Sequence, residues 1–135
     1  KYISLAYIII EPGAAAGWVG NAKLLPRNNP ELTAVYALTA EMYGFSMVYL
    51  EAGSGAGKIP PSHISLAREL ISIPIIAGGG INTKEDARSF IEAGADIIVM
   101  VSFIEENVLR DKGRSLEPVI REIKQAAMKR NKTLN

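Results

Sequence analysis

The chain has 135 residues, of which 48% are hydrophobic, and its formal net charge is +1. This composition predicts one domain with a hydrophobic core rather than a disordered chain, and the low net charge excludes a whole-surface attraction to nucleic acid. No apolar run reaches the roughly 18 residues of a membrane span, and the absence of cysteine excludes disulfides and thiolate metal sites. Because the chain starts at Lys1 and enters a strand pattern at once, we expect a fragment of a longer protein.

Apolar runs alternate with helical patterns along the whole chain, four times over. The expected strands, which are short and apolar, cover residues 3–10, 45–50, 74–77 and 95–100. The expected helices, which carry helical spacing or capping residues, cover 30–42, 61–71, 83–93 and 115–130, with a short extra helix over 103–109. The first strand is apolar at nearly every position, which predicts burial on both faces.

Capping residues and turns mark where these elements begin and end. Asn29 followed by Pro30 is typical of a helix start, and Gly44 is placed to end that helix. The run from Thr83 to Asp86 resembles a capping box, and Gly94 caps the helix that it opens. Residues 14–20 are small and apolar, and we expect them to form a loop.

This order of four strand–helix units predicts one α/β domain over residues 1–135, with a parallel sheet. Right-handed crossovers would bring all four strand-to-helix loops to the same edge of that sheet. Two architectures fit the pattern, an open doubly wound sheet and part of an eight-fold βα barrel. Such a barrel needs roughly 200 residues or more, so four units would make half of one.

Two of the strand-to-helix loops are rich in glycine and predict a shared anion site. The first contains Gly53, Ser54 and Gly55, and the second contains Gly78, Gly79 and Gly80. Glycine lets the backbone turn with positive φ and lets a ligand approach the N–H groups closely. Loops that follow strands are where βα barrels bind phosphate. As a more ordinary interpretation, each loop is only a flexible turn.

Several side chains near these loops could act on a bound ligand. Glu51 ends a buried strand beside the first glycines, where a carboxylate suits a general base or a group that orients a hydroxyl. The loop over 14–20 could line a groove for an apolar ligand, cover the site, or simply pack on the rim. Lys23, Arg27 and Lys58 could meet a diphosphate, although isolated basic residues are more often solvated.

Together these segments resemble the geranylgeranylglyceryl phosphate synthase family. The motifs that carry the resemblance are Tyr49-Leu50-Glu51-Ala52-Gly53-Ser54-Gly55, Ile8-Ile9-Ile10-Glu11-Pro12-Gly13, Gly17-Trp18-Val19-Gly20 and Gly78-Gly79-Gly80-Ile81. The likeness covers nearly the whole chain but only the carboxyl-terminal half of that family's TIM (β/α)8 barrel. It implies parallel βα units that form this half-barrel, with the amino-terminal half absent.

The resemblance also implies a reaction and its residues. In the family, the sn-3 hydroxyl of sn-glycerol 1-phosphate attacks C1 of geranylgeranyl diphosphate to form the first ether bond of archaeal membrane lipids. Glu51 and Tyr49 would be catalytic. The residues expected to bind the phosphate and glycerol are Tyr49, Leu50, Glu51, Ala52, Gly53, Ser54, Gly55, Gly78, Gly79, Gly80, Val101 and Ser102. Those expected at the prenyl groove or lid are Gly13, Ala14, Gly17 and Trp18.

Two departures from the family pattern qualify these expectations. Val101-Ser102 stands where the family carries a glycine and a small polar residue, and valine would be strained there if the site needs positive φ. The family's acidic ligands for Mg²⁺ have no counterpart, so we expect no metal site in this chain and magnesium bound by the missing half.

The resemblance sets the remaining expectations as well. We expect small-molecule substrates, no nucleic acid, a cytoplasmic protein with no transmembrane span, transient contact with a membrane surface, and a homo-oligomer. The chain alone would be inactive. The alternatives are another phosphate-binding TIM-barrel enzyme, such as an isomerase or lyase, and an inactive half-barrel that binds phosphate.

Overall fold

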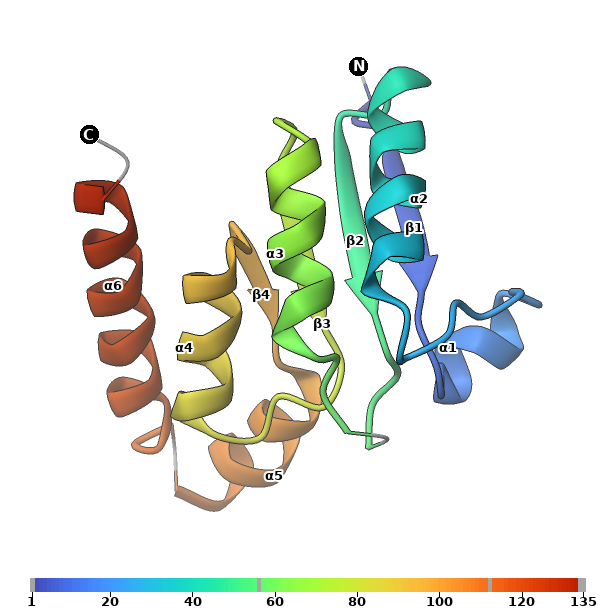
Figure 1. Ribbon diagram of the computed structural model, residues 1–135. Coiled ribbons are helices and arrows are strands. Elements are labelled where there is room, and N and C mark those ends of the chain that lie inside the picture. The colour runs from blue at the N-terminus through green and yellow to red at the C-terminus, as the bar shows by residue number, and fades with distance from the viewer. Residues whose placement is uncertain (1, 56, 112, 134–135) are drawn as a thin grey trace.

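A computed structural model describes residues 2–55, 57–111 and 113–133 (Figure 1). Strands and helices alternate as expected, and the strands form one parallel sheet in the order β1-β2-β3-β4. The strands are β1 (Leu5–Ile9), β2 (Met47–Glu51), β3 (Ile75–Gly78) and β4 (Ile97–Val99). The helices are α1 (Ala14–Val19), α2 (Pro30–Met42), α3 (Pro61–Leu70), α4 (Lys84–Ala93), α5 (Val101–Asp111) and α6 (Leu116–Thr133).

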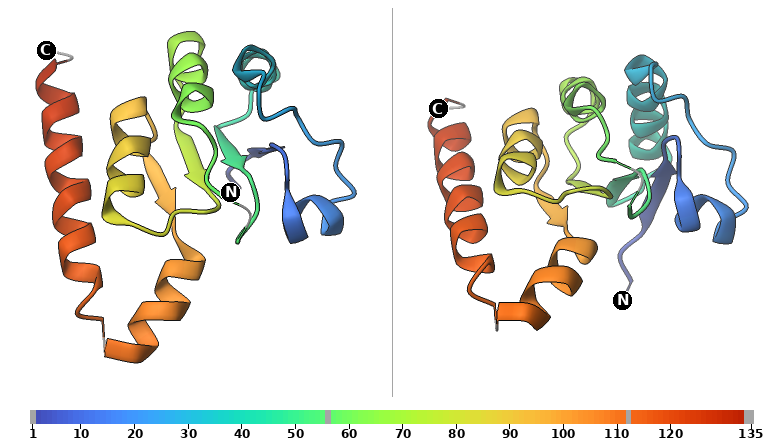
Figure 2. Two further views of the ribbon diagram at one scale, coloured as in Figure 1. Left: turned by 60° about the horizontal axis from the view of Figure 1, so that its bottom comes forward. Right: turned by 90° about the horizontal axis from the view of Figure 1, so that it is seen from below.

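One face of the sheet packs against helices, and this contact makes the core. Figures 1 and 2 show α2, α3 and α4 side by side on the same face, with α6 beyond α4. The strand side chains that point toward them are fully buried, as at Val48, Leu50 and Ile75. Phe90 of α4 is the largest side chain in this core. A strand that alternates in this way has its other side chains on the opposite face.

That opposite face is uncovered by any helix in the described part of the chain (Figure 2). Leu5 and Tyr7 of β1 are 38% and 48% exposed, and Ile97 of β4 is 45% exposed. The prediction that the first strand is buried on both faces is therefore wrong for this chain. A continuous apolar run shows that both faces suit an apolar environment, but it does not show that both faces are covered.

Local sequence signals set most of the helix ends. Thr83 and Asp86 form the expected capping box, and Gly94 ends α4 with left-handed φ. Asn29 caps α2 by accepting a hydrogen bond from the Leu32 amide. The expected loop over 14–20 is instead the short helix α1, because its three successive alanines have the highest helix propensity.

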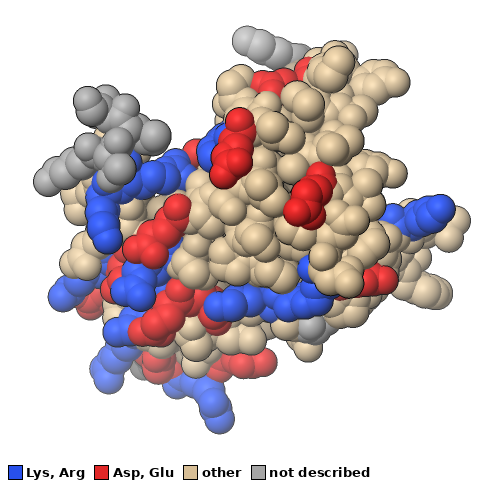
Figure 3. Space-filling model, in the orientation of Figure 1, with Lys and Arg blue, Asp and Glu red and all other residues tan. Residues whose placement is uncertain are grey.

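The outer helical surface is charged unevenly. Figure 3 shows most acidic and basic side chains over α4 and α6, whereas the surface over α2 is largely uncharged. Ion pairs on the charged side include Arg88–Glu122 between α4 and α6, and Arg121–Glu117 within α6. On α2, Val35 and Tyr36 are each 52% exposed.

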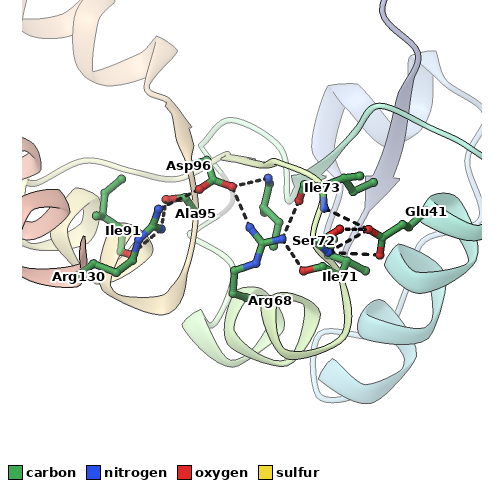
Figure 4. A network of polar contacts seen from close by, with 10 residues as sticks. Glu41, Arg68, Ile71, Ser72, Ile73, Ile91, Ala95, Asp96 and Arg130 are labelled. Atoms are coloured by element: carbon green, nitrogen blue, oxygen red, sulfur yellow. Dashed lines mark hydrogen bonds and ion pairs between the residues drawn. The ribbon is translucent and has the colours of Figure 1, made fainter. Parts of the chain in front are cut away.

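A polar network ties the helices together at the amino-terminal edge of the sheet (Figure 4). Asp96, just before β4, accepts hydrogen bonds from the Ile75 amide, Arg68 and Arg130, each at 2.9 Å. Arg68 also donates to the carbonyls of Ile71 and Ile73, both at 2.7 Å. One carboxylate therefore joins α3, β3 and α6 at the edge opposite the glycine loops.

We expect Asp96→Ala to lower the free energy of unfolding by about 1–3 kcal/mol, because it leaves the Ile75 amide without its acceptor and removes the charged acceptor of Arg68 and Arg130. Thermal unfolding followed by circular dichroism measures this change. Arg121→Ala is the control, since its helical pair with Glu117 is 69% and 76% exposed and such pairs contribute about 0.3–0.5 kcal/mol. Equal effects of the two substitutions would contradict a structural role for the network.

Candidate functional site

The parallel register brings polar groups together at the carboxyl ends of the strands. Ile9 pairs with Glu51, Glu51 with Gly78, and Gly78 with Val99, so these four residues form one row across the sheet. A pocket of about 40 Å³ opens beside this row, and a single water needs roughly 10–15 Å³. Its polar and glycine lining residues are Tyr49, Glu51, Ser54, Gly79, Gly80 and Ser102.

Two loops that leave the sheet here form most of the pocket. The first glycine loop is residues 52–60, between β2 and α3, and the second glycine loop is residues 79–83, between β3 and α4. The start of α5 closes the third side through Val101 and Ser102. The structure therefore brings the two glycine loops to one pocket, and the binding of an anion there stays a prediction.

Glu51 is the acidic group in the pocket, and only 7% of it is exposed. Its Oε1 accepts a hydrogen bond from the Gly53 amide at 2.7 Å, which fixes the carboxylate against the start of the first glycine loop. Its Oε2 accepts a longer bond, 3.4 Å, from the Tyr7 hydroxyl. The bond from Gly53 is thus short, the contact with Tyr7 is at the long limit of a hydrogen bond, and the Tyr49 hydroxyl is a third neighbour of this carboxylate.

Two tyrosines border Glu51 on adjacent strands. Tyr7 and Tyr49 are paired in the register, and their rings meet edge to face with centroids 4.7 Å apart. Burial, followed by the neighbouring Glu51 carboxylate, raises the pKa of Tyr49 far above its usual value. The same two causes raise the pKa of Tyr7. Both hydroxyls are therefore protonated donors near neutral pH.

Gly79 is required by both its conformation and its surroundings. Its φ is +84°, and a Cβ there would overlap Glu51 Oε1 and approach the Gly53 amide nitrogen within 2.9 Å. The second glycine loop consequently lies directly against the engaged side of Glu51. This close approach needs a residue without a side chain.

Val101 and Ser102 enter the site as the first two residues of α5. Val101 has no positive φ, because the described non-glycine residues with positive φ are Ala14 and Asn21. The strain expected at Val101 is therefore absent, and the loop has a different shape from the one that needs glycine. Helix α5 starts at the pocket, where the first amides of a helix lack partners within the helix.

Some of the residues assigned to the site by sequence lie behind it. Leu50 and Ala52 are fully buried in the hydrophobic core. Gly78 supports the Tyr49 ring, since a Cβ there would overlap the Tyr49 hydroxyl. Gly53 packs on the start of α1, and Gly55 is exposed.

The residues predicted to form a prenyl groove or lid lie on different sides of α1. Gly13 and Gly17 face inward against Leu24, whereas Trp18 is 86% exposed. Ala14 is the first residue of α1 and lies against Gly53. Figure 2 shows α1 and α5 at the same end of the sheet, on either side of the glycine loops.

The sequence analysis missed several residues at the pocket. Ile81, Val99 and Met100 line it, and Tyr7 donates to Glu51. A signal for Tyr7 was present, because it is the one hydroxyl-bearing side chain between Leu5 and Ile10. It stands two positions before the end of β1, as Tyr49 stands two positions before the end of β2.

Two of the basic residues expected to meet a diphosphate are engaged with the protein. The Arg27 guanidinium donates to the Lys58 carbonyl at 2.5 Å, and the Lys58 ammonium pairs with Asp86. His63, the single histidine, is fully buried between the Thr33 hydroxyl and the Arg27 carbonyl. Its environment is that of a structural histidine.

Within the described ranges, no group of three or more histidine, cysteine, aspartate or glutamate side chains could bind a metal ion. The helices in those ranges also include none that is both long and apolar enough to cross a membrane.

We expect Gly79→Ala to destabilise the fold and to displace Glu51. Gly44→Ala is a matched control, because Gly44 has nearly the same φ, +83°, with open space around it. The free energy of unfolding of the control should fall only by the cost of positive φ for alanine, about 1–2 kcal/mol. That of Gly79→Ala should fall by at least about 1 kcal/mol more, because of the overlap. Thermal unfolding compares the two, and equal losses would contradict the close approach at Gly79.

The raised pKa of Tyr49 predicts a loss of stability in alkali. A group whose pKa is higher in the folded state contributes stability below its unfolded pKa, about 10, and loses it as the pH rises further. The unfolding free energy should therefore fall more steeply above about pH 10 in the natural chain than in Tyr49→Phe. Urea unfolding at several pH values measures this free energy. The same pH dependence in both proteins would contradict the burial of Tyr49 beside Glu51.

The sequence and the fold both match known proteins. The chain matches the PcrB family over residues 1–127. It is 52% identical over 113 residues to a geranylgeranylglyceryl phosphate synthase of Thermococcus gammatolerans, covering 83% of this chain and 45% of that protein. It is 49% identical over 124 residues to the Thermococcus kodakarensis protein of the same name, covering 90% of this chain and 49% of that protein. The chain thus spans about half the length of the curated relatives it matches.

Solved structures agree with this match. The crystal structure of (S)-3-O-geranylgeranylglyceryl phosphate synthase from Thermoplasma acidophilum in complex with substrate sn-glycerol-1-phosphate superposes with a TM-score of 0.84 at 38% identity, covering 91% of this chain and 49% of that one. The corresponding enzyme of Thermoplasma volcanium gives a TM-score of 0.77 at 36% identity, with 93% and 48% covered. The four units therefore correspond to half of a TIM barrel, and the chain belongs to the PcrB family.

Proposed function

We propose that this chain is the part of a prenyltransferase that binds the phosphate-bearing acceptor. The proposed reaction joins geranylgeranyl diphosphate to sn-glycerol 1-phosphate and makes the first ether bond of archaeal membrane phospholipids. The observation that carries the proposal is the placement of the Glu51 carboxylate beside a small pocket formed by two glycine loops and a helix start. The named relatives, one of them solved with sn-glycerol-1-phosphate, support the choice of substrate.

The proposed step is a displacement in which Glu51 takes up a proton. The sn-3 hydroxyl oxygen forms a bond to C1 of the prenyl group, the bond from C1 to the diphosphate oxygen breaks, and diphosphate leaves with its electron pair. The hydroxyl proton passes to Glu51 Oε2, the oxygen with the long contact to Tyr7. Gly53 supports this role, because its bond to Oε1 keeps Oε2 as the oxygen available to the hydroxyl.

The acceptor phosphate would occupy the side of the pocket away from the Tyr7 hydroxyl. Backbone amides in the second glycine loop, the Ser54 and Ser102 hydroxyls, and the amides at the start of α5 are donors of the type that binds phosphate. Tyr49, which stays protonated, can orient a glycerol hydroxyl. These donors lie on three successive strand-to-helix connections, so one phosphate can contact all of them.

The prenyl chain would lie near α1. Trp18 and Val19 are 86% and 76% exposed there, and α1 begins against the first glycine loop through Ala14 and Gly53. Exposed apolar side chains next to a phosphate pocket favour a long apolar substrate over the small polar substrates of isomerases and lyases.

The remaining expectations stay proposals. We propose, as the family resemblance implies, that Mg²⁺ is bound by a part of the barrel outside this chain, and no step above depends on it. We also propose, from the family resemblance, a cytoplasmic location, transient contact with a membrane surface and a homo-oligomer. Exposed Val35, Tyr36 and Met42 on α2 support an interface between copies.

The test uses a hybrid barrel, in which this chain replaces the matching segment of the Thermococcus gammatolerans relative. Incubated with sn-glycerol 1-phosphate, geranylgeranyl diphosphate and Mg²⁺, the hybrid barrel should form the ether product, detected by mass spectrometry. Glu51→Gln should lower kcat by at least about 100-fold, the lower range for loss of a general base, because glutamine keeps the shape and the Gly53 bond but cannot take up the proton.

Glu69→Gln is the matched control, since Glu69 is an exposed glutamate on α3, and it should retain the full rate. The unmodified relative shows that the assay works. A folded hybrid barrel that makes no product would contradict the proposed function, and full activity of Glu51→Gln would contradict the assignment of the base alone.

A further inference from the structure

A chain of polar contacts joins three successive strand-to-helix connections behind the pocket. Arg27 follows β1, Lys58 lies in the first glycine loop, and Asp86 lies in the first turn of α4. The Arg27 guanidinium donates to the Lys58 carbonyl, and the Lys58 ammonium contacts the Asp86 carboxylate. Lys58 is therefore held through both its backbone and its side chain, although it is absent from the pocket lining.

Asp86 is the fixed end of this chain of contacts. Its Oδ2 accepts hydrogen bonds from the amides of Asn82 and Thr83 at 3.2 and 3.1 Å, and its own amide donates to the Thr83 hydroxyl. The carboxylate is 17% exposed. Burial alone would raise its pKa, but the hydrogen bonds from Lys58 and the helix start outweigh burial and leave the pKa below its usual value. Asp86 is thus ionised near neutral pH and hydrogen-bonded to the helix start through its Oδ2.

Lys58 stands where the two glycine loops touch. A Cβ on Gly80 would overlap the carbonyl carbon of Gly57 and the amide nitrogen of Lys58, so the second glycine loop lies directly against the Gly57–Lys58 peptide. The first glycine loop is fixed at its start by the bond from the Gly53 amide to Glu51. Between these points, Ser54 and Gly55 are exposed. The position of Ser54 therefore depends on how firmly the two ends of its loop are held.

We propose that Lys58 is a positioning residue, whose ion pair with Asp86 holds the loop that carries Ser54 against the loop that carries Gly79 and Gly80. The pair preforms the acceptor pocket, so the ligand does not have to order the first glycine loop when it binds. The inference rests on the proposed function for the identity of the ligand, but the loop contact itself does not. A lysine that bound the phosphate directly would be expected in the pocket lining, whereas Lys58 is absent from it and its ammonium is directed at Asp86.

A double-mutant cycle separates these two roles. Lys58→Met removes the charge and keeps the apolar stem, Asp86→Asn removes the charge and keeps an acceptor for the Thr83 amide, and the third variant combines both. In the hybrid barrel, each single variant should weaken binding of sn-glycerol 1-phosphate about ten-fold by calorimetry, and the double variant should be no weaker than either. Lys58→Arg should restore most of the affinity, and Arg88→Met, which removes the ion pairs of Arg88 with Glu92 on α4 and with Glu122 on α6, should leave it unchanged.

Hydrogen–deuterium exchange provides a readout that needs no ligand. In both single variants the amide of Gly53, which is bonded to Glu51 in this loop, should exchange faster than in the natural sequence, and those of the core strand β2 should not. If the natural hybrid barrel fails to bind sn-glycerol 1-phosphate and this exchange pattern still appears, the positioning role stands and the proposed function fails.

Two results would overturn the positioning role. In the first, Lys58→Met weakens binding while Asp86→Asn binds as well as the natural sequence or more tightly, which would mean that Lys58 contacts the phosphate itself. In the second, exchange at the Gly53 amide is unchanged in both single variants, which would mean that the pair does not hold the loop.

Discussion

The parallel register of the four strands is the constraint on which the site depends. It places Ile9, Glu51, Gly78 and Val99 in one row, and every connection that leaves this row must start at the same edge of the sheet. A slip of one residue in β2 would turn Glu51 toward the helices and put Leu50 at the pocket. The fully buried Leu50 and Val48 therefore position Glu51, because they hold β2 in its register against the core.

The two edges of the sheet use polar groups in different ways. At the amino-terminal edge, the Asp96 carboxylate is saturated by three donors and joins the helices to the sheet. At the carboxyl-terminal edge, the Glu51 carboxylate accepts a short bond from Gly53 and a long one from Tyr7 and lines a pocket. Stability and chemistry are separated across the sheet in the way expected of βα barrels, and the uncovered face with Leu5 and Ile97 is where the other half of such a barrel would pack.

Sequence reasoning predicted the features that depend on local rules. Capping at Thr83 and Gly94 and the alternation of strands with helices follow from nearest-neighbour chemistry, and the shared edge for the glycine loops follows from crossover handedness. It failed where the outcome depends on contacts distant in the sequence. The exposure of Tyr7, the engagement of Lys58 by Asp86 and the helical backbone at Val101 each depend on which segment packs nearby. The helix α1 was missed for another reason, because its glycine and tryptophan obscured a run of three alanines.

We propose that the pocket between the glycine loops binds the phosphate of a glycerol phosphate and presents its hydroxyl to Glu51. A crystal structure of the hybrid barrel with sn-glycerol 1-phosphate tests it most directly. We expect the phosphate oxygens to lie within about 3 Å of the Gly80 amide and of the Ser54 and Ser102 hydroxyls, with a glycerol hydroxyl hydrogen-bonded to Glu51. A phosphate bound elsewhere, such as the surface groove between Lys84 and Arg121, with the glycine loops empty, would contradict it.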